Sequence, residues 1–319
     1  MVYTSLTEAP HNLKDGIDWL IALRGTDAEA NLKAMGAAIH KLLADKPVGY
    51  TEVPGLEAVK QISKEFMEKP ELKYHWCVER LLKRFNKPMG KAPSLLEKWF
   101  GIIAESDYAN VVQNHGFDRQ AMSDKLAQVV DSCDKFLNEM KDPDHYTSAY
   151  GSDATWAKSC AKDPEACAVI LVGVAPMLYT GLRSLWDVSF FAAKKIPPFN
   201  SKRRLLDMLK AVGYGEPVCP AGIGASDVRK AFNLMEVDIF TTLYDLGGFW
   251  AFYGDKNAAN SKSLRDVAPA DSVEGEGRVG EEPEGEEPEG EEPEGEEPEG
   301  EASEGEASEG EESEGEDSS

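Results

Sequence analysis

Residues 163–195 read D-P-E-A-C-A-V-I-L-V-G-V-A-P-M-L-Y-T-G-L-R-S-L-W-D-V-S-F-F-A-A-K-K, and this stretch decides the fold. Asp163 suits a helix N-cap, and Pro164 suits the first helical position, where a missing N–H costs nothing. No charged side chain occurs from residue 166 to residue 182. Because a helix that is apolar on every side must be buried, we expect a long helix at the centre of the molecule.

Such a helix could be buried in a protein core or in a bilayer. The 17 uncharged residues would form roughly 26 Å of helix, against about 30 Å for the hydrocarbon core of a membrane. Gly173, Pro176 and Gly181 interrupt the stretch. Arg183 and Asp187 follow it closely, and no polybasic flank marks a cytoplasmic side. The sequence therefore favours a central core helix over a membrane span.

The rest of the first 254 residues shows the apolar period of amphipathic helices, about one apolar position every 3.6 residues. No convincing alternating pattern of a strand appears. The fold class expected is all-α, an irregular multi-helix bundle around the buried apolar central helix. The other helices are predicted at residues 12–24, 27–42, 56–66, 78–85, 94–103, 108–114, 118–140, 201–212, from 226 onward, and 238–253.

The chain divides by composition into a helical domain at 1–254, a linker at 255–279 and a tail at 280–319. A polar stretch at 142–152, D-P-D-H-Y-T-S-A-Y-G-S, is either a long loop or a break between two helical subdomains. The helical domain carries 32 acidic and 30 basic residues, whereas the tail carries 21 acidic residues and no Lys or Arg. Most of the net charge of -24 therefore belongs to the tail.

The tail repeats a pentad eight times: G-E-E-P-E four times, then G-E-A-S-E twice, G-E-E-S-E and G-E-D-S-S. Regular Gly and Pro with self-repelling charge predict a disordered, extended segment. Its charge would repel nucleic acid, so no nucleic-acid partner is expected. Ser303, Ser308 and Ser313 each stand three residues before an acidic residue, which makes them candidate phosphorylation sites for an acidophilic kinase.

No pattern for catalysis, cofactor binding or metal binding is visible. The glycine loop at 222–227 follows no predicted strand, and the basic cluster at 202–204 is interpreted as a solvated helix face. No two of the five histidines stand four residues apart: they are His11, His40, His75, His115 and His145. We therefore expect a protein that is not an enzyme, with no catalytic residue, no cofactor and no metal site.

Five cysteines occur, and two of them are close enough in sequence to bridge. Cys160 and Cys167 flank the predicted start of the central helix, and a disulfide between them would stabilise the fold by about 2–3 kcal/mol. Cys77 and Cys133 fall at apolar helix positions and are expected to be buried thiols. The odd number argues against a full disulfide framework, so both the bridged and the reduced forms of this pair stay open.

Targeting signals are not visible at either end of the sequence. Residues 1–5 lack a positive n-region and an apolar h-region, and the acidic C-terminus has no hydrophobic tail for an anchor. On these signals alone, the expected location is the cytosol.

Several phrases, taken in order, look familiar. They are L-T-E-A-P at 6–10 with N-L-K-D-G-I-D-W-L at 12–20, R-F-N-K-P-M at 84–89, D-P-E-A-C at 163–167, M-L-Y-T-G-L at 177–182 and G-F-W-A-F-Y at 248–253. Together they resemble the secreted-antigen proteins of Babesia parasites, which are related in their opening phrase to the variant erythrocyte surface antigens. The resemblance covers about residues 5–254. It implies a non-enzymatic antigen, secreted or exposed at the infected erythrocyte, and it implies no catalytic or ligand residue.

Two functions follow from these expectations. The first is a parasite antigen with a role in host interaction or immune evasion, whose partners are the host erythrocyte or host antibodies against the repeated tail. The alternative is an intracellular helical scaffold, whose acidic tail solubilises it or binds basic partners.

Overall fold

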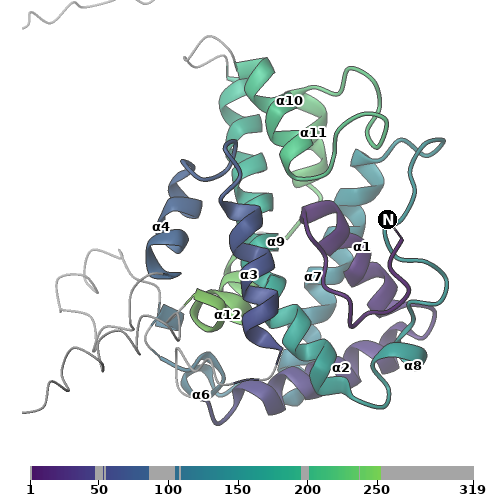
Figure 1. Cartoon of the computed structure of the whole chain (residues 1–319), viewed down its shortest axis with the longest axis vertical. Coiled ribbons are helices and arrows are strands. Elements are labelled where there is room, and N and C mark those ends of the chain that lie inside the picture. The colour runs from purple at the N-terminus through teal and green to yellow at the C-terminus, as the bar shows by residue number, and fades with distance from the viewer. Residues whose placement is uncertain are drawn as a thin grey trace, which may run out of the picture. The chain divides into compact units, whose positions relative to one another are not determined.

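The computed structural model of this chain describes residues 2–46, 53, 55–85, 105–107, 109–194, 201–236 and 238–252. All of them belong to one compact unit, Met1–Ala268. The second unit, Pro269–Ser319, lies outside the described residues. Within the described residues every regular element is a helix, and one isolated bridge joins Tyr3 to Tyr150. The predicted all-α class is confirmed (Figure 1).

The described part of the chain contains eleven α-helices and one 3-10 helix, labelled in Figure 1. They are α1 (Leu13–Arg24), α2 (Ala28–Leu43), α3 (Leu56–Met67), α4 (Trp76–Phe85), η1 (Glu105–Asp107), α6 (Val111–His115), α7 (Arg119–Met140), α8 (Trp156–Ser159), α9 (Pro164–Ala193), α10 (Ser201–Ala211), α11 (Ala225–Phe232) and α12 (Ile239–Phe252).

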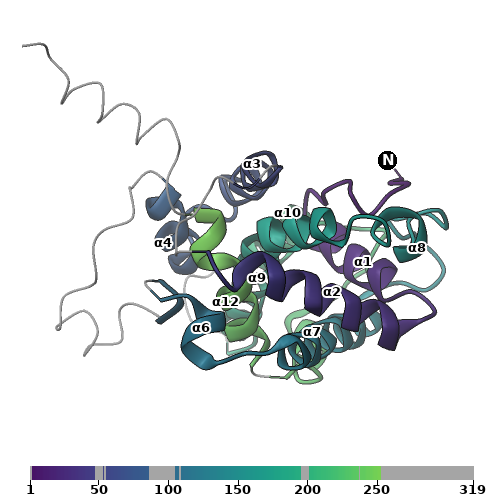
Figure 2. The same cartoon turned by 90° about the horizontal axis from the view of Figure 1, so that it is seen from below.

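The 30-residue helix α9 is the centre of this bundle, and it packs against α1, α2, α3, α4, α10, α11 and α12 (Figures 1 and 2). It begins where Asp163 accepts a hydrogen bond from the backbone N–H of Ala166 at 3.2 Å. It continues through Pro176, whose carbonyl accepts the Thr180 hydroxyl at 2.7 Å. The helix is long and apolar enough to cross a membrane, but 83% of its most apolar window is buried inside the protein. The predicted buried central helix is confirmed.

Two glycines allow close contacts between neighbouring helices. A Cβ atom on Gly173 of α9 would lie only 2.4 Å from Cγ1 of Val59 in α3. A Cβ atom on Gly36 of α2 would lie 2.6 Å from Cα of Ser123 in α7. Distances this short are not tolerated between carbon atoms, so a side chain at either glycine would push the paired helices apart.

The polar stretch 142–152 lies against the N-terminal segment. The backbone N–H of Tyr3 donates to the carbonyl of Ala149 at 2.8 Å, and that of Gly151 donates to the carbonyl of Tyr3 at 2.9 Å. The predicted domain boundaries remain predictions. The predicted helix at 94–103, the linker at 255–279 and the acidic tail at 280–319 lie outside the described residues.

Candidate functional site

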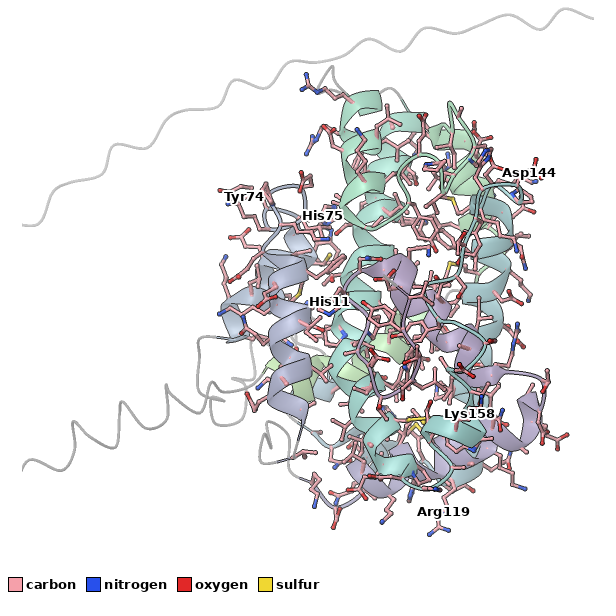
Figure 3. The ribbon with its side chains drawn as sticks, turned by 45° about the vertical axis from the view of Figure 1, so that its right-hand side comes forward. His11, Tyr74, His75, Arg119, Asp144 and Lys158 are labelled. Atoms are coloured by element: carbon pink, nitrogen blue, oxygen red, sulfur yellow. A yellow bond between two sulfur atoms is a disulfide. The ribbon has the colours of Figure 1, made fainter. Side chains whose placement is uncertain are left out.

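A disulfide joins Cys160 and Cys167, the two cysteines that flank the start of the central helix. Their Cα atoms are 5.8 Å apart, and both residues are fully buried. Cys160 is the C-cap of α8 and Cys167 lies in the first turn of α9, so the bond ties these helices together. In Figure 3 it is the yellow bond close to the labelled Lys158.

The other residues that the sequence singled out form no site within the part of the chain that the structure describes. Cys77 and Cys133 are buried free thiols, as predicted, and Cys219 is a third. The candidate phosphorylation sites Ser303, Ser308 and Ser313 lie outside the described residues. Among the residues that the structure describes, no group of three or more His, Cys, Asp or Glu side chains could hold a metal ion.

The opening phrase of the chain builds a buried ion pair. Asp18 accepts hydrogen bonds from Lys14 Nζ at 2.9 Å, from the backbone N–H of Ala149 at 2.7 Å and from the Tyr146 hydroxyl. Lys14 Nζ also donates to the carbonyl of Thr147 at 2.7 Å. Burial, together with the Asp18 charge, raises the pKa of Tyr146 well above its ordinary range. The pair therefore fastens α1 to the 142–152 stretch.

Other residues of that phrase also have structural contacts. The indole Nε1 of Trp19 donates to the carbonyl of Leu6 at 2.8 Å. Asn12 caps α1 by accepting the backbone N–H of Asp15 at 2.9 Å. Gly16 lies against Leu178 of the central helix, where a Cβ atom would come within 2.7 Å of Cδ2. The phrase is thus a determinant of the fold, not an exposed binding motif.

A second buried charge cluster ties α4, η1 and α12 together. The Asp107 carboxylate accepts hydrogen bonds from Arg84, from Arg80 Nη2 at 3.2 Å and from the Tyr244 hydroxyl at 2.5 Å. Both arginines also lie over the Tyr244 ring. Because each charge is paired and lies between helices, the cluster acts as a structural clamp.

One arrangement has the order of a catalytic triad. His75 Nδ1 lies 3.3 Å from Cys77 Sγ, and His75 Nε2 lies 3.5 Å from Asp187 Oδ2. A nucleophile, a base and an orienting carboxylate stand in this order in cysteine hydrolases. Cys77 is only 1% exposed, however, and burial raises the pKa of its thiol to about 12. Burial also lowers the pKa of His75. The thiol therefore stays protonated and out of reach of a substrate.

The same histidine borders the strongest candidate for a binding surface. A hollow of about 240 Å³ lies between the α3–α4 connection, the end of α9 and α10. Its lining includes Tyr74, His75, Val188, Arg204 and Met208. Figure 3 shows Tyr74 and His75 at the edge of the bundle beside these helices.

Exposed aromatic side chains come from the elements that border this hollow. Tyr74 is 79% exposed, Trp76 51% and Phe191 50%, and no other Phe, Tyr or Trp among the described residues is exposed. Phe191 lies one turn beyond Val188 on the same flank of α9. We call this region the Tyr74 surface and define it by Lys73, Tyr74, Trp76, Val188, Phe191 and Arg204. Clustered exposed aromatics mark interaction sites more often than chance exposure does.

No family model, curated protein or solved structure matches this chain. What these side chains can do therefore follows from their own chemistry.

Sequence reasoning missed both the Lys14–Asp18 pair and the Tyr74 surface. The pair had a signal, since two opposite charges stand four residues apart on an otherwise apolar helix face. The Tyr74 surface had a weaker signal in the sequence, which is the run Y-H-W at 74–76 between two predicted helices. Local patterns do not indicate which distant residues lie against the Lys14–Asp18 pair or against the Y-H-W run. For this reason the sequence could not assign a role to either feature.

Proposed function

We propose that this protein is a non-enzymatic parasite antigen, secreted or exposed at the infected erythrocyte, where it serves host interaction or immune evasion. The observation that carries the proposal is the disulfide between Cys160 and Cys167. Disulfides form and persist in oxidising compartments and are rare in reducing cytosol. The bond therefore supports export, in agreement with what the resemblance to secreted Babesia antigens implies.

The non-enzymatic part of the proposal rests on the chemistry of the buried groups. The triad-like arrangement of His75, Cys77 and Asp187 contains a thiol whose pKa is raised to about 12 by burial, so it supplies no thiolate near neutral pH. The phrases that carry the resemblance contribute residues to the N-terminal corner and to the central helix. They support a shared fold and point to no shared reaction.

The acidic tail supports the antigen proposal from its sequence. Eight similar pentads offer one antibody many equivalent sites, and such repetition increases avidity without any new contact. The host partners proposed are therefore antibodies against the tail, together with the erythrocyte surface.

The alternative function, an intracellular scaffold, is favoured by a different observation. Cys77, Cys133 and Cys219 all remain unpaired. Three free thiols are more typical of a reducing compartment than of a secreted disulfide protein.

The redox state and the location of the native protein separate these two functions. Parasite cultures would be treated with a thiol-blocking reagent before lysis, and the cysteine peptides identified by mass spectrometry. We expect Cys160 and Cys167 to be disulfide-bonded and antibody to residues 1–254 to stain material outside the parasite. Cys77, which is buried and free, is the internal control, because it should become alkylated only after denaturation. Cytosolic staining together with two reduced cysteines would establish the scaffold instead.

A further inference from the structure

We propose that the Tyr74 surface docks on anionic lipid bilayers. This inference goes beyond the proposed export and is independent of it. A protein that is not exported could still bind vesicles, and an exported one could fail to bind them.

The aromatic side chains of this surface have the character of interfacial anchors. Tyr74 and Trp76 come from the α3–α4 connection and the first residue of α4, and Phe191 comes from the last turn of α9. Trp76 is held in place because its Nε1 donates to Asp187 at 2.7 Å, while half of the residue stays exposed. Tyr and Trp are enriched where a membrane meets water, because their rings are apolar and their tips are polar.

Basic side chains lie beside two of these rings and at the ends of the neighbouring helices. Lys73 Nζ lies 4.8 Å from the centre of the Tyr74 ring, and the Arg183 guanidinium lies 5.2 Å from that of Trp76. Lys194 follows at the end of α9, and Arg203 and Arg204 lie near the start of α10.

This local basic excess contrasts with the rest of the chain. Three acids lie among these five bases: Glu71 and Asp207 line the hollow, and Asp187 pairs with Arg183 at 3.5 Å. Of these bases, Arg203 has only a loose ion pair, with its Nε 3.9 Å from Asp207, and no ion pair of Arg204 occurs within the described residues. The five bases outnumber these three acids, although residues 1–254 as a whole carry a net charge of -2. Exposed aromatic side chains set among basic ones fit an anionic bilayer.

The shape of the surface favours a bilayer over a protein partner. The hollow of about 240 Å³ is smaller than the roughly 300–1,000 Å³ of a typical ligand pocket. The exposed rings instead stand at an interhelix connection and at a helix end. The acidic tail would repel an anionic bilayer, but salt screens this repulsion beyond the Debye length of about 8 Å at physiological salt. Only tail charges within about that distance of the bilayer would oppose binding.

The test is co-sedimentation of the full-length protein with vesicles. One set of vesicles would contain phosphatidylcholine alone, and the other phosphatidylcholine with about 30 mol% of the anionic lipid phosphatidylserine. At 0.1 M NaCl we expect the protein to bind the anionic vesicles. Binding to the neutral vesicles should be weaker by at least about fivefold, which is the contribution of a single base near an anionic surface. Raising the salt to 0.5 M NaCl should release the protein.

Paired variants locate the binding face. Each base near an anionic surface contributes about fivefold in affinity, so Arg203→Glu with Arg204→Glu should weaken binding by at least about 25-fold. Tyr74→Ala with Phe191→Ala should weaken it by about tenfold through lost apolar contact. The matched charge control is Arg119→Glu with Lys158→Glu, whose residues are labelled at the opposite end of Figure 3, and it should change binding by less than about threefold.

All of these residues except Arg119 and Lys158 lie on or beside the Tyr74 surface, and the thermal melt of each variant would show that it is folded. An unchanged affinity in folded Arg203→Glu/Arg204→Glu protein would overturn the inference, as would equal weakening in the control pair. Absence of the wild-type protein from the vesicle pellet would also overturn it, and the surface would then be left to an acidic protein partner.

Discussion

At the scale of single residues, the Lys14–Asp18 pair shows how a charged motif can serve folding alone. Both side chains are buried, and each has further backbone partners in the 142–152 stretch. A buried ion pair contributes little net stability compared with apolar residues, because both charges lose their water. Removing one partner is costly, since it leaves the other charge buried without compensation.

A double-mutant cycle on this pair tests that argument. Asp18→Ala and Lys14→Met should each lower the free energy of unfolding by about 3–5 kcal/mol, measured by urea denaturation. The double variant should cost about 1–3 kcal/mol less than the sum of the two, because no unpaired charge then remains.

The control is the ion pair between Lys158 and Asp153, whose side chains are 63% and 67% exposed. Its cycle should give a coupling below about 1 kcal/mol. Equal coupling in the buried and the exposed pair would contradict the role assigned to Lys14 and Asp18.

At the scale of elements, the contact between α3 and α9 depends on Gly173. In an ordinary helix interior, Gly→Ala is stabilising by about 1 kcal/mol. Here the new Cβ atom would meet Val59 at 2.4 Å, and overpacking of a tight core costs about 1–3 kcal/mol. The steric term therefore outweighs the helix propensity, and Gly173→Ala should lower the free energy of unfolding.

The sign of this effect should reverse when the obstacle is removed. In a Val59→Gly background, which loses both Cγ atoms and also the Cβ atom that would lie 2.7 Å away, Gly173→Ala should be stabilising by up to about 1 kcal/mol, because the next nearest atom is Leu56 Cδ1 at 3.5 Å. Urea denaturation of the four proteins measures both effects. The packing argument fails if Gly173→Ala is equally destabilising in the two backgrounds.

Local sequence signals were enough to predict most of these elements. Asp163 and Asp118 were identified as the starts of α9 and α7, and each accepts a backbone N–H of its helix. The four-residue helix α8 was not predicted, because it is too short to show a period. The start of α11 was placed at Ser226, whereas the structure caps it at Gly224, whose N–H donates to Asp227 at 2.9 Å.

The candidate site could not be predicted in the same way, because its parts meet only in the tertiary fold. His75 and Asp187 come from elements that are more than 100 residues apart in the chain, and the hollow adds Arg204 from a third. Residue types such as the exposed Tyr74 are visible in the sequence, but their exposure depends on how α9 and α10 pack around them.

At the scale of the whole molecule, the structure and the composition place stability and net charge in different parts of the chain. The described helices contain the apolar core. Residues 280–319 contain no Val, Leu, Ile, Met, Phe, Tyr or Trp, so they offer almost no apolar surface to bury.

Deleting residues 280–319 should therefore leave the melting temperature of the protein, measured by calorimetry, within about 2 °C of the full-length value. A shift of that size corresponds to a change of less than about 1 kcal/mol in the free energy of unfolding. The positive control is Cys160→Ala with Cys167→Ala, which opens the disulfide loop and should remove about 2–3 kcal/mol. A large drop on tail deletion would show that the tail contributes contacts to the helical domain.

The contacts that close the N-terminal corner also constrain the order in which the chain can fold during synthesis. Ala149, whose backbone N–H donates a hydrogen bond to the Asp18 carboxylate, lies 131 residues beyond Asp18 in the chain. At roughly 5–20 residues per second, a ribosome needs about 7–26 seconds to add that length. During this interval α1 can pack only against elements made earlier, such as α2 and α7, while Lys14 and Asp18 lack their partners in the 142–152 stretch. Helix α1 therefore waits for a segment made much later, and a chaperone has time to bind it in between.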